Sequence, residues 1–181
     1  MKIRLLTPIA LLLFALGGPQ AALAQAAPSA QAETRLDSGD RDFLENAAQA
    51  GHLEVEGSRL ALDKARSPEV KRFAQKMIED HGKAGQELAA LAKHKGYDAP
   101  TGPSVMQKAR LQALGLRDDG FDKAYADEIG VGAHEQAVEL FEKASNEVKD
   151  PDIRQFAIQT LPTLQQHLQM AKSLKQSTEK Q

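Results

Sequence analysis

Apolar residues recur every three or four positions along four long stretches of this chain, which is the spacing of one face of a helix. The stretches cover about residues 40–65, 68–96, 118–148 and 151–178. Polar and charged residues fill the positions between, and no strict alternation of the kind that marks a strand interrupts them. The pattern predicts four long amphipathic helices and therefore an all-α fold.

Two of these helices have clear start signals. Ser67-Pro68 and Asp150-Pro151 each combine a side chain that can cap a helix with a proline at the first helical position, where its missing N–H costs nothing. The second helix should end at Gly96, after a basic last turn. The third should begin at Asp118 or Asp119, with Gly130 and Gly132 weakening its middle.

A connection rich in proline and glycine separates the second helix from the third. It holds a short candidate helix from Ser104 to about Leu114 and is long enough to cross a bundle lengthwise. In the fourth helix Pro162 lies opposite the apolar stripe, so its ring should face outward and bend the helix. The predicted fold is a four-helix bundle with a long crossover that contains the short helix.

The N-terminal segment differs from the rest of the chain. Lys2 and Arg4 precede an apolar run over residues 5–16, which is too short for a bilayer-spanning helix. Ala22-Leu23-Ala24 supplies the small residues that a signal peptidase needs, so residues 1–24 are predicted to be a signal peptide, with cleavage after Ala26 as the near alternative. A retained membrane anchor is the less favoured interpretation. Residues 25–37 then form a flexible leader, and residues 38–178 form the bundle domain.

Composition excludes several classes of function. The chain has no cysteine and no tryptophan, which excludes disulfide scaffolds, thiol enzymes and thiolate metal sites. The formal net charge is −2 and charges of both signs alternate, so nucleic acid is not an expected partner. Beyond the first segment no apolar run is long enough to serve as a transmembrane anchor. We expect an exported, periplasmic protein, with a protein partner or a second copy of the chain left open.

Several short motifs together resemble a known family. They are Asp40-Arg41-Asp42-Phe43-Leu44, Ser67-Pro68-Glu69-Val70-Lys71, Asp80-His81, His134-Glu135, and Leu161-Pro162-Thr163-Leu164 followed by His167. In this order they resemble the exported bacterial ferritin-like family known as domain of unknown function 4142, over about residues 38–175. The resemblance implies a ferritin-like four-helix bundle behind a signal peptide and brings no established activity.

Four polar residues fall on apolar helix faces and suggest a metal site. Glu54, His81 and His167 lie close to the centre lines of their stripes, whereas His134 is about 60° off its own stripe. All four lie within about 5 Å of the midpoints of their helices, at ~1.5 Å per residue. One carboxylate and three imidazoles at one depth predict a mononuclear site, with zinc most compatible and iron, nickel, manganese or copper also open.

A metal-free explanation remains open, because the same four side chains can form a buried hydrogen-bonded polar layer. In that case the protein would be a non-catalytic envelope module that binds a protein partner. Asp80 or Glu135 would orient a ligand from the flank, Met77 belongs to the core rather than to a copper site, and His52, Glu56 and His94 should point away from the core.

Catalytic motifs are absent from the sequence. The residues three positions before His81, His134 and His167 are Ile78, Val131 and Leu164, so the Glu-x-x-His pairs of di-iron proteins do not occur. No phosphate-binding glycine loop, His-Glu-x-x-His motif or nucleophile elbow is present either. An enzymatic activity is therefore not the expectation.

Overall fold

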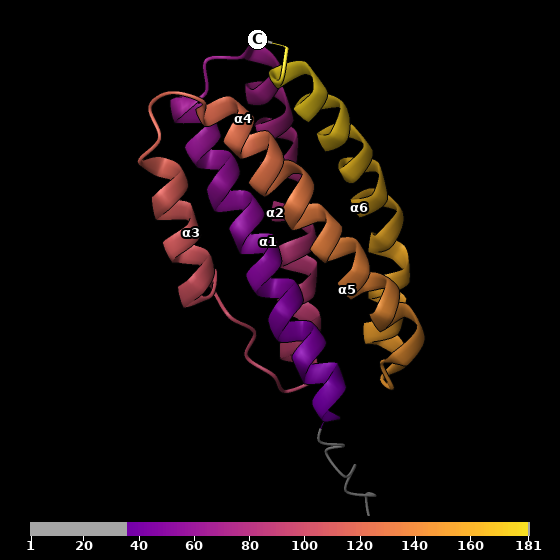
Figure 1. The fold of residues 1–181 in the computed structure, drawn as a ribbon. Coiled ribbons are helices and arrows are strands. Elements are labelled where there is room, and N and C mark those ends of the chain that lie inside the picture. The colour runs from indigo at the N-terminus through magenta and orange to yellow at the C-terminus, as the bar shows by residue number, and fades with distance from the viewer. Residues whose placement is uncertain (1–35, 181) are drawn as a thin grey trace, which may run out of the picture. The chain divides into compact units, whose positions relative to one another are not determined.

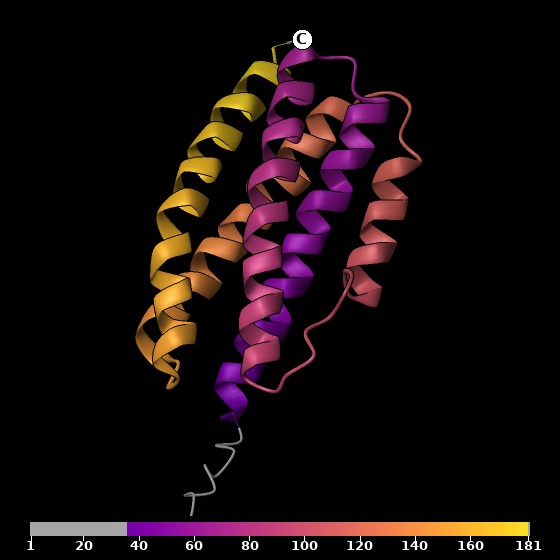
Figure 2. The same cartoon turned by 180° about the vertical axis from the view of Figure 1, so that it is seen from behind.

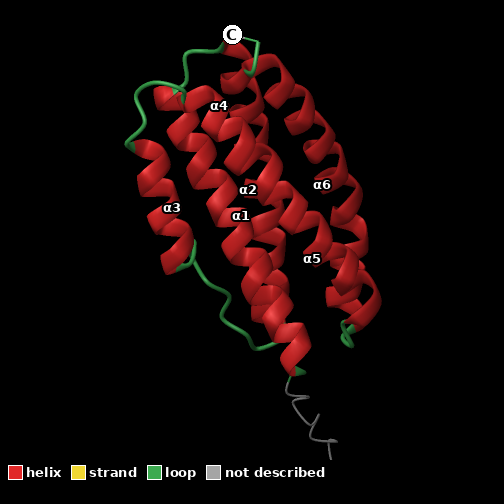
Figure 3. Ribbon diagram, viewed as in Figure 1, coloured by secondary structure: helices red, strands yellow, loops and turns green. Residues whose placement is uncertain are grey.

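The computed structural model describes residues 36–180, and every regular element in that range is a helix (Figure 3). The elements are α1 (Ser38–Lys64), α2 (Pro68–His94), α3 (Val105–Gly115), α4 (Phe121–Tyr125), the π-helix η1 (Ala126–Ala133), α5 (His134–Glu147) and α6 (Pro151–Thr178). The all-α prediction is confirmed. The predicted signal peptide and the predicted leader up to residue 35 lie outside the described residues.

The predicted helix starts are confirmed together with their caps. Ser67 accepts a hydrogen bond from the backbone N–H of Val70 and precedes Pro68. Asp150 accepts from the backbone N–H groups of Asp152 and Ile153, which satisfies donors that the helix itself leaves free. At the end of α2, Gly96 adopts a φ of 72°, the left-handed conformation that glycine adopts without strain.

The long helices lie side by side (Figures 1 and 2). α1 and α2 run in opposite directions, as do α5 and α6, and the connection after α2 returns along the length of the molecule before α4 begins. α3 belongs to this connection and lies alongside α1, away from α6. The predicted lengthwise crossover with a short helix inside it is therefore present.

The third long helix differs from the prediction in two ways. It begins at Phe121 rather than at Asp118 or Asp119, after Gly120 with a φ of 69°. Its middle is a π-helix, not an α-helix, over Ala126–Ala133. Gly130 and Gly132 lie inside this wider turn. π-Helical turns are rare in proteins, and those that occur are often found at functional sites. They change the direction in which the following side chains point.

Pro162 lies inside α6 with its side chain exposed, as the sequence predicts, and α6 continues through it to Thr178. α6 is therefore one helix on both sides of the proline. Its buried residues include Leu164, His167, Leu168 and Ala171, on the face turned away from Pro162.

The core consists of two apolar clusters with a polar layer between them. One cluster includes Phe73, Met77 and Tyr125, and the other includes Phe43, Phe141 and Phe156. Each candidate metal ligand lies where its helix passes from one cluster to the other. Met77 and Leu88 flank His81 on α2, Ala133 and Ala137 flank His134 at the start of α5, and Leu164 and Leu168 flank His167 on α6. On α1 the change of cluster falls between Ala48 and Leu53, and Glu54 directly follows Leu53.

None of the helices within residues 36–180 has the length and apolar character needed to cross a membrane.

Asp40 joins the first turn of α1 to the loop between α5 and α6. Its side chain is buried, and its two oxygens accept hydrogen bonds from the backbone N–H groups of Lys149 (2.8 Å) and Asp150 (3.1 Å). Asp40→Ala leaves both donors without these acceptors, so we expect the free energy of unfolding to fall by about 1.5–3 kcal/mol, measured by chemical denaturation. Asp42→Ala, at an exposed position of the same helix, is the matched control and should change it by less than ~0.5 kcal/mol. Equal losses in the two variants would contradict the structural role of Asp40.

Candidate metal centre

The four predicted site residues meet in the polar layer. Glu54 comes from α1, His81 from α2, His134 from the first position of α5 and His167 from α6. Their exposed fractions are 1% for Glu54, 6% for His81, 0% for His134 and 1% for His167. Four helices thus bring one carboxylate and three imidazoles into a space that solvent barely reaches.

One ring nitrogen of each histidine faces the other two rings. Nε2 of His81 lies 3.2 Å from Nε2 of His134 and 3.3 Å from Nδ1 of His167, and one nitrogen from each of the three rings lies within 4.8 Å of the others. A tetrahedral metal with bonds of ~2.0–2.1 Å to nitrogen separates its ligand nitrogens by about 3.3 Å. The two short contacts therefore have the spacing that a single coordinated ion requires.

The other nitrogen of each ring is held by an oxygen that can only accept a hydrogen bond. Nδ1 of His81 donates to Glu54 Oε2 at 2.9 Å, Nδ1 of His134 donates to the carbonyl of Ile129 at 3.2 Å, and Nε2 of His167 donates to Asp80 Oδ2 at 2.8 Å. Because each neutral imidazole carries a single proton, these bonds leave a lone pair on every nitrogen that faces the centre. The arrangement resembles the carboxylate–histidine–metal pattern of known metal sites.

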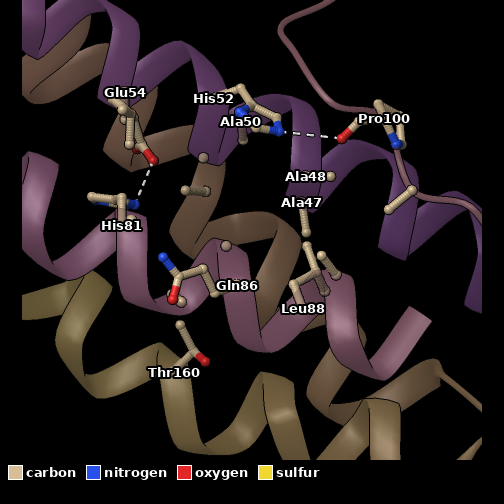
Figure 4. Close-up of a pocket in the computed structure, with 18 of the residues that line it drawn as sticks. Ala47, Ala48, Ala50, His52, Glu54, His81, Gln86, Leu88, Pro100 and Thr160 are labelled. Carbon is tan, nitrogen blue, oxygen red and sulfur yellow. Dashed lines mark hydrogen bonds and ion pairs between the residues drawn. The ribbon is translucent and has the colours of Figure 1, made fainter. Parts of the chain in front are cut away.

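The Glu54 carboxylate, which the sequence suggested as a ligand, lies beside His81, as Figure 4 shows. It approaches Nδ1 of His81, whereas the contacts with His134 and His167 use Nε2 of that ring. Its second oxygen, Oε1, lies 3.6 Å from Nδ1 of His134 and has no hydrogen-bond partner among the described residues. A helical wheel predicts that a side chain points inward, but it does not tell which ring edge that side chain will meet.

The π-helix explains why His134 looked misplaced on a regular wheel. A wider turn advances fewer degrees per residue, so the residues that follow it are rotated back relative to an ideal α-helix. The carbonyl of Ile129, five residues before His134, accepts the bond from its ring. η1 also packs closely on α1, because a Cβ at Gly57 would lie only 3.1 Å from side-chain atoms of Ile129. The sequence showed the glycines but not this change of turn.

Burial and charge act in opposite directions on the four groups. Burial raises the pKa of Glu54. The facing imidazoles, above all His81, lower this pKa by more than burial raises it, so the net shift is downward. Burial lowers the pKa of His81, yet the Glu54 carboxylate outweighs it and the net shift is upward. Burial lowers the pKa of His134, and it lowers that of His167 to about 4. Any proton at the centre therefore resides on His81, beside Glu54.

The flanking residues have separate outcomes. Asp80 contacts His167, as the sequence suggested for a flanking carboxylate, and Lys76 lies 2.8 Å from the same carboxylate oxygen. Glu135 is exposed and pairs with Lys172 instead. His94 is exposed as predicted, whereas His52 is half-buried because its Nε2 bonds the carbonyl of Pro100 in the crossover.

Two further residues complete the surroundings of the site. Met77 is fully buried in the apolar cluster, as expected. Ser58 and Tyr125 form a buried pair that was not predicted from the sequence, with their hydroxyl oxygens 2.8 Å apart. Both lie on the inward-facing stripes of their helices, which is the signal that would have found them.

Solved structures with a similar fold include metal-binding proteins. A DUF305 fragment from Deinococcus radiodurans has a TM-score of 0.68 at 12% identity, covering 78% of this chain and 98% of its own. CopM in a Cu(II)-bound form has a TM-score of 0.64 at 19% identity, covering 76% and 96%. CopM in an Ag-bound form has a TM-score of 0.63 at 18% identity, covering 76% and 95%. At these identities the likeness is one of fold.

The comparison with curated proteins finds no match. The comparison with family models matches residues 25–174 to a domain of unknown function, DUF4142, which agrees with the resemblance of the sequence motifs. Because the match extends over most of the sequence, the chain belongs to the DUF4142 family.

Proposed function

We propose that this protein binds one transition-metal ion through the facing nitrogens of His81, His134 and His167. The observation that carries the proposal is the closeness of one ring nitrogen from each histidine, with all three within 4.8 Å of one another and two pairs at 3.2 and 3.3 Å, while every opposite nitrogen is engaged by an oxygen acceptor. Glu54 and Asp80 then hold the rings of His81 and His167 without coordinating the ion.

A metal-free polar layer is the alternative, and it needs an extra proton. Three lone pairs cannot form hydrogen bonds with one another, so one ring must become an imidazolium and donate to its neighbours. His81, paired with Glu54, is the ring that would do so. In the proposed function a metal ion replaces that proton, and the positive charge beside the buried carboxylate is kept in both states.

Copper is the first metal to test and zinc the second. Imidazole suits both, and the donor set contains no thiolate to select between them. CopM, which shares the fold, is described in Cu(I)-bound, Cu(II)-bound and Ag-bound forms, which supports copper. Zinc follows as the second candidate, because imidazole donors suit it as well.

The proposal is one of metal binding, not of catalysis. We place the domain over residues 38–178 and regard its arrangement as ferritin-like in the sense of long helices around a polar centre. A ferroxidase function is not part of the proposal, because the three histidines lack carboxylates three positions earlier. Handling of metal in the cell envelope is the role that best fits these features.

Export to the periplasm is the proposed location, on the strength of the predicted signal peptide. If residues 1–24 are removed, the mature protein begins at Gln25, or at Ala27 if cleavage follows Ala26. The intact mass of protein isolated from the periplasm of a bacterial host decides between these products. Full-length chain recovered from the membrane fraction would contradict the location.

Removing any one histidine should abolish most of the stabilisation by metal. A metal that binds only the folded protein, at a hundredfold excess over its Kd, adds ~2.7 kcal/mol, which corresponds to roughly 5–11 °C in Tm for a chain of this size. We expect His81→Leu, His134→Leu and His167→Leu to lose most of this rise in thermal melting with Cu⁺ or Zn²⁺.

The matched control is His94→Leu, which removes an exposed histidine of α2 and should keep the full rise. Comparing each variant with and without metal separates ligand loss from any change in the stability of the metal-free protein. A native chain that melts at the same temperature with copper, zinc, nickel, iron, manganese or chelator would contradict the proposed function.

Glu54→Gln distinguishes a polar layer that binds a metal ion from a metal-free, hydrogen-bonded layer. Glutamine keeps the shape and can still accept from Nδ1 of His81, but it removes the negative charge. If Glu54 orients a metal ligand, the metal Kd should rise about 10–100-fold, measured by competition with a chelator of known affinity. In a metal-free layer, by contrast, the same change should leave the melting temperature unchanged or higher, because the protonated ring can become neutral again.

A further inference from the structure

The metal centre is enclosed, so an ion needs a route to it. The three imidazoles are at least 94% buried by accessible surface, and an apolar cluster lies on each side of the polar layer along the helices. The apolar clusters therefore offer few polar contacts to a partly dehydrated cation, since the buried hydroxyls of Ser58 and Tyr125 are already paired with each other. Any ready path must pass between helices at the level of the polar layer.

A pocket of about 480 Å³ begins at that level and extends along the apolar cluster that contains Phe141 of α5 and Phe156 of α6, because both residues also line it. Glu54 and His81 form part of its wall, and the exposed residues Arg59, Gln86 and Thr101 line it as well, so it reaches from the surface to the site (Figure 4). The crossover contributes Pro100, whose carbonyl is held by His52 at 3.2 Å. The pocket thus connects solvent to the hydrogen-bonded pair of Glu54 and His81.

Small residues keep this pocket open. Gly51 on α1 and Gly82 and Gly85 on α2 line it, and a Cβ built at any of the three would have no atom within 4 Å. Glycine inside a helix costs about 1 kcal/mol relative to alanine, and none of these three is needed for a close helix contact. Gly57, one and a half turns further along α1, differs because it packs against Ile129.

A second pocket is a poorer path for a cation. It measures about 400 Å³ and reaches Asp80, but its lining sets Lys76 and Lys83 against Asp80 and Glu87 and so offers no net negative charge, and Lys76 is already paired with Asp80. The first pocket has one cationic side chain, Arg59, against the carboxylates of Glu54 and Glu56. In the first pocket the group at the inner end is the Glu54 carboxylate, whose Oε1 has no hydrogen-bond partner among the described residues.

We propose that the pocket between α1, α2 and the crossover is the route by which the metal ion enters and leaves, and that Glu54 is the first site group to meet it. This inference rests on the proposed metal binding and adds a kinetic role that the equilibrium proposal does not require. Because the ion crosses the same constriction in both directions, narrowing the pocket slows loading and release by one common factor and leaves Kd unchanged.

The test measures loading and release of Cu⁺ in pocket-filling variants of the full mature chain. Gly51→Leu and Gly85→Leu fill the pocket from its two helix walls, singly and together. Loading is followed by stopped-flow mixing of the metal-free protein with Cu⁺, and release by transfer of Cu⁺ to an excess of a chromogenic chelator. We expect both rates to fall at least tenfold in the double variant while Kd stays within about twofold of the native value.

Two controls keep the result specific. Ala90→Leu adds a similar side chain at an exposed position of α2 outside the pocket and should leave both rates unchanged. Gly85→Ala makes the same glycine replacement with little filling and should change them less than Gly85→Leu. If one of the variants Gly51→Leu and Gly85→Leu alters Kd, the rates are compared in the other variant, whose Kd is unchanged.

The outcomes separate the two proposals. Native protein that binds Cu⁺, with filling variants that keep Kd and load at the native rate, overturns the route and leaves the metal site standing. Rates that fall in Ala90→Leu as much as in the double variant overturn it as well. Failure of the native protein to bind Cu⁺ or Zn²⁺ overturns the metal site itself, and the route with it.

Discussion

The Glu54 carboxylate, buried at the centre of the helices, imposes the main constraint on this structure. A charge in such a place is costly unless groups of opposite charge or hydrogen-bond donors face it, and His81 is the group that meets it directly. The choice of His81 as donor fixes its tautomer, and the bonds from His134 to Ile129 and from His167 to Asp80 fix the other two. The oxygen acceptors at the outer edge of the layer therefore set the tautomers, and one nitrogen of each ring is left facing the other two rings.

The surrounding helices serve this layer in different ways. α2 and α6 are regular where they present His81 and His167, so an ordinary α-helical spacing suffices there. The third helical run reaches the same level from Phe121 through a π-helix, and the Ile129 carbonyl of that π-helix accepts the hydrogen bond from the His134 ring. The close packing of Ile129 on Gly57 holds that irregular segment against α1.

The pocket beside Glu54 and His81 reduces the apolar surface that the helices bury there, so other parts of the core must supply more of the stability. Alanine and glycine line much of the pocket between α1 and α2, and such residues bury little apolar surface. The aromatic pairs near both ends of the molecule, Phe43 with Phe141 and Phe73 with Tyr125, supply larger contacts in the two apolar clusters. A pocket lined by small residues beside Glu54 and His81 is consistent with the proposed entry and release of a metal ion.

The sequence by itself determined the helices, because a 3.6-residue period and local capping depend only on neighbours in the chain. Pro68, Pro151 and the inward direction of His81 and His167 were all readable in this way. The tertiary structure alone decided that the Glu54 carboxylate lies 2.9 Å from Nδ1 of His81, and that a π-helix precedes His134. The position of Glu54 depends on which edge of the His81 ring it meets across the bundle. The π-helix is a change of the backbone that does not alter the spacing of apolar residues in the sequence. A helical wheel gives the direction in which a side chain leaves its own helix, whereas contacts in a site are set by distances between side chains on different helices.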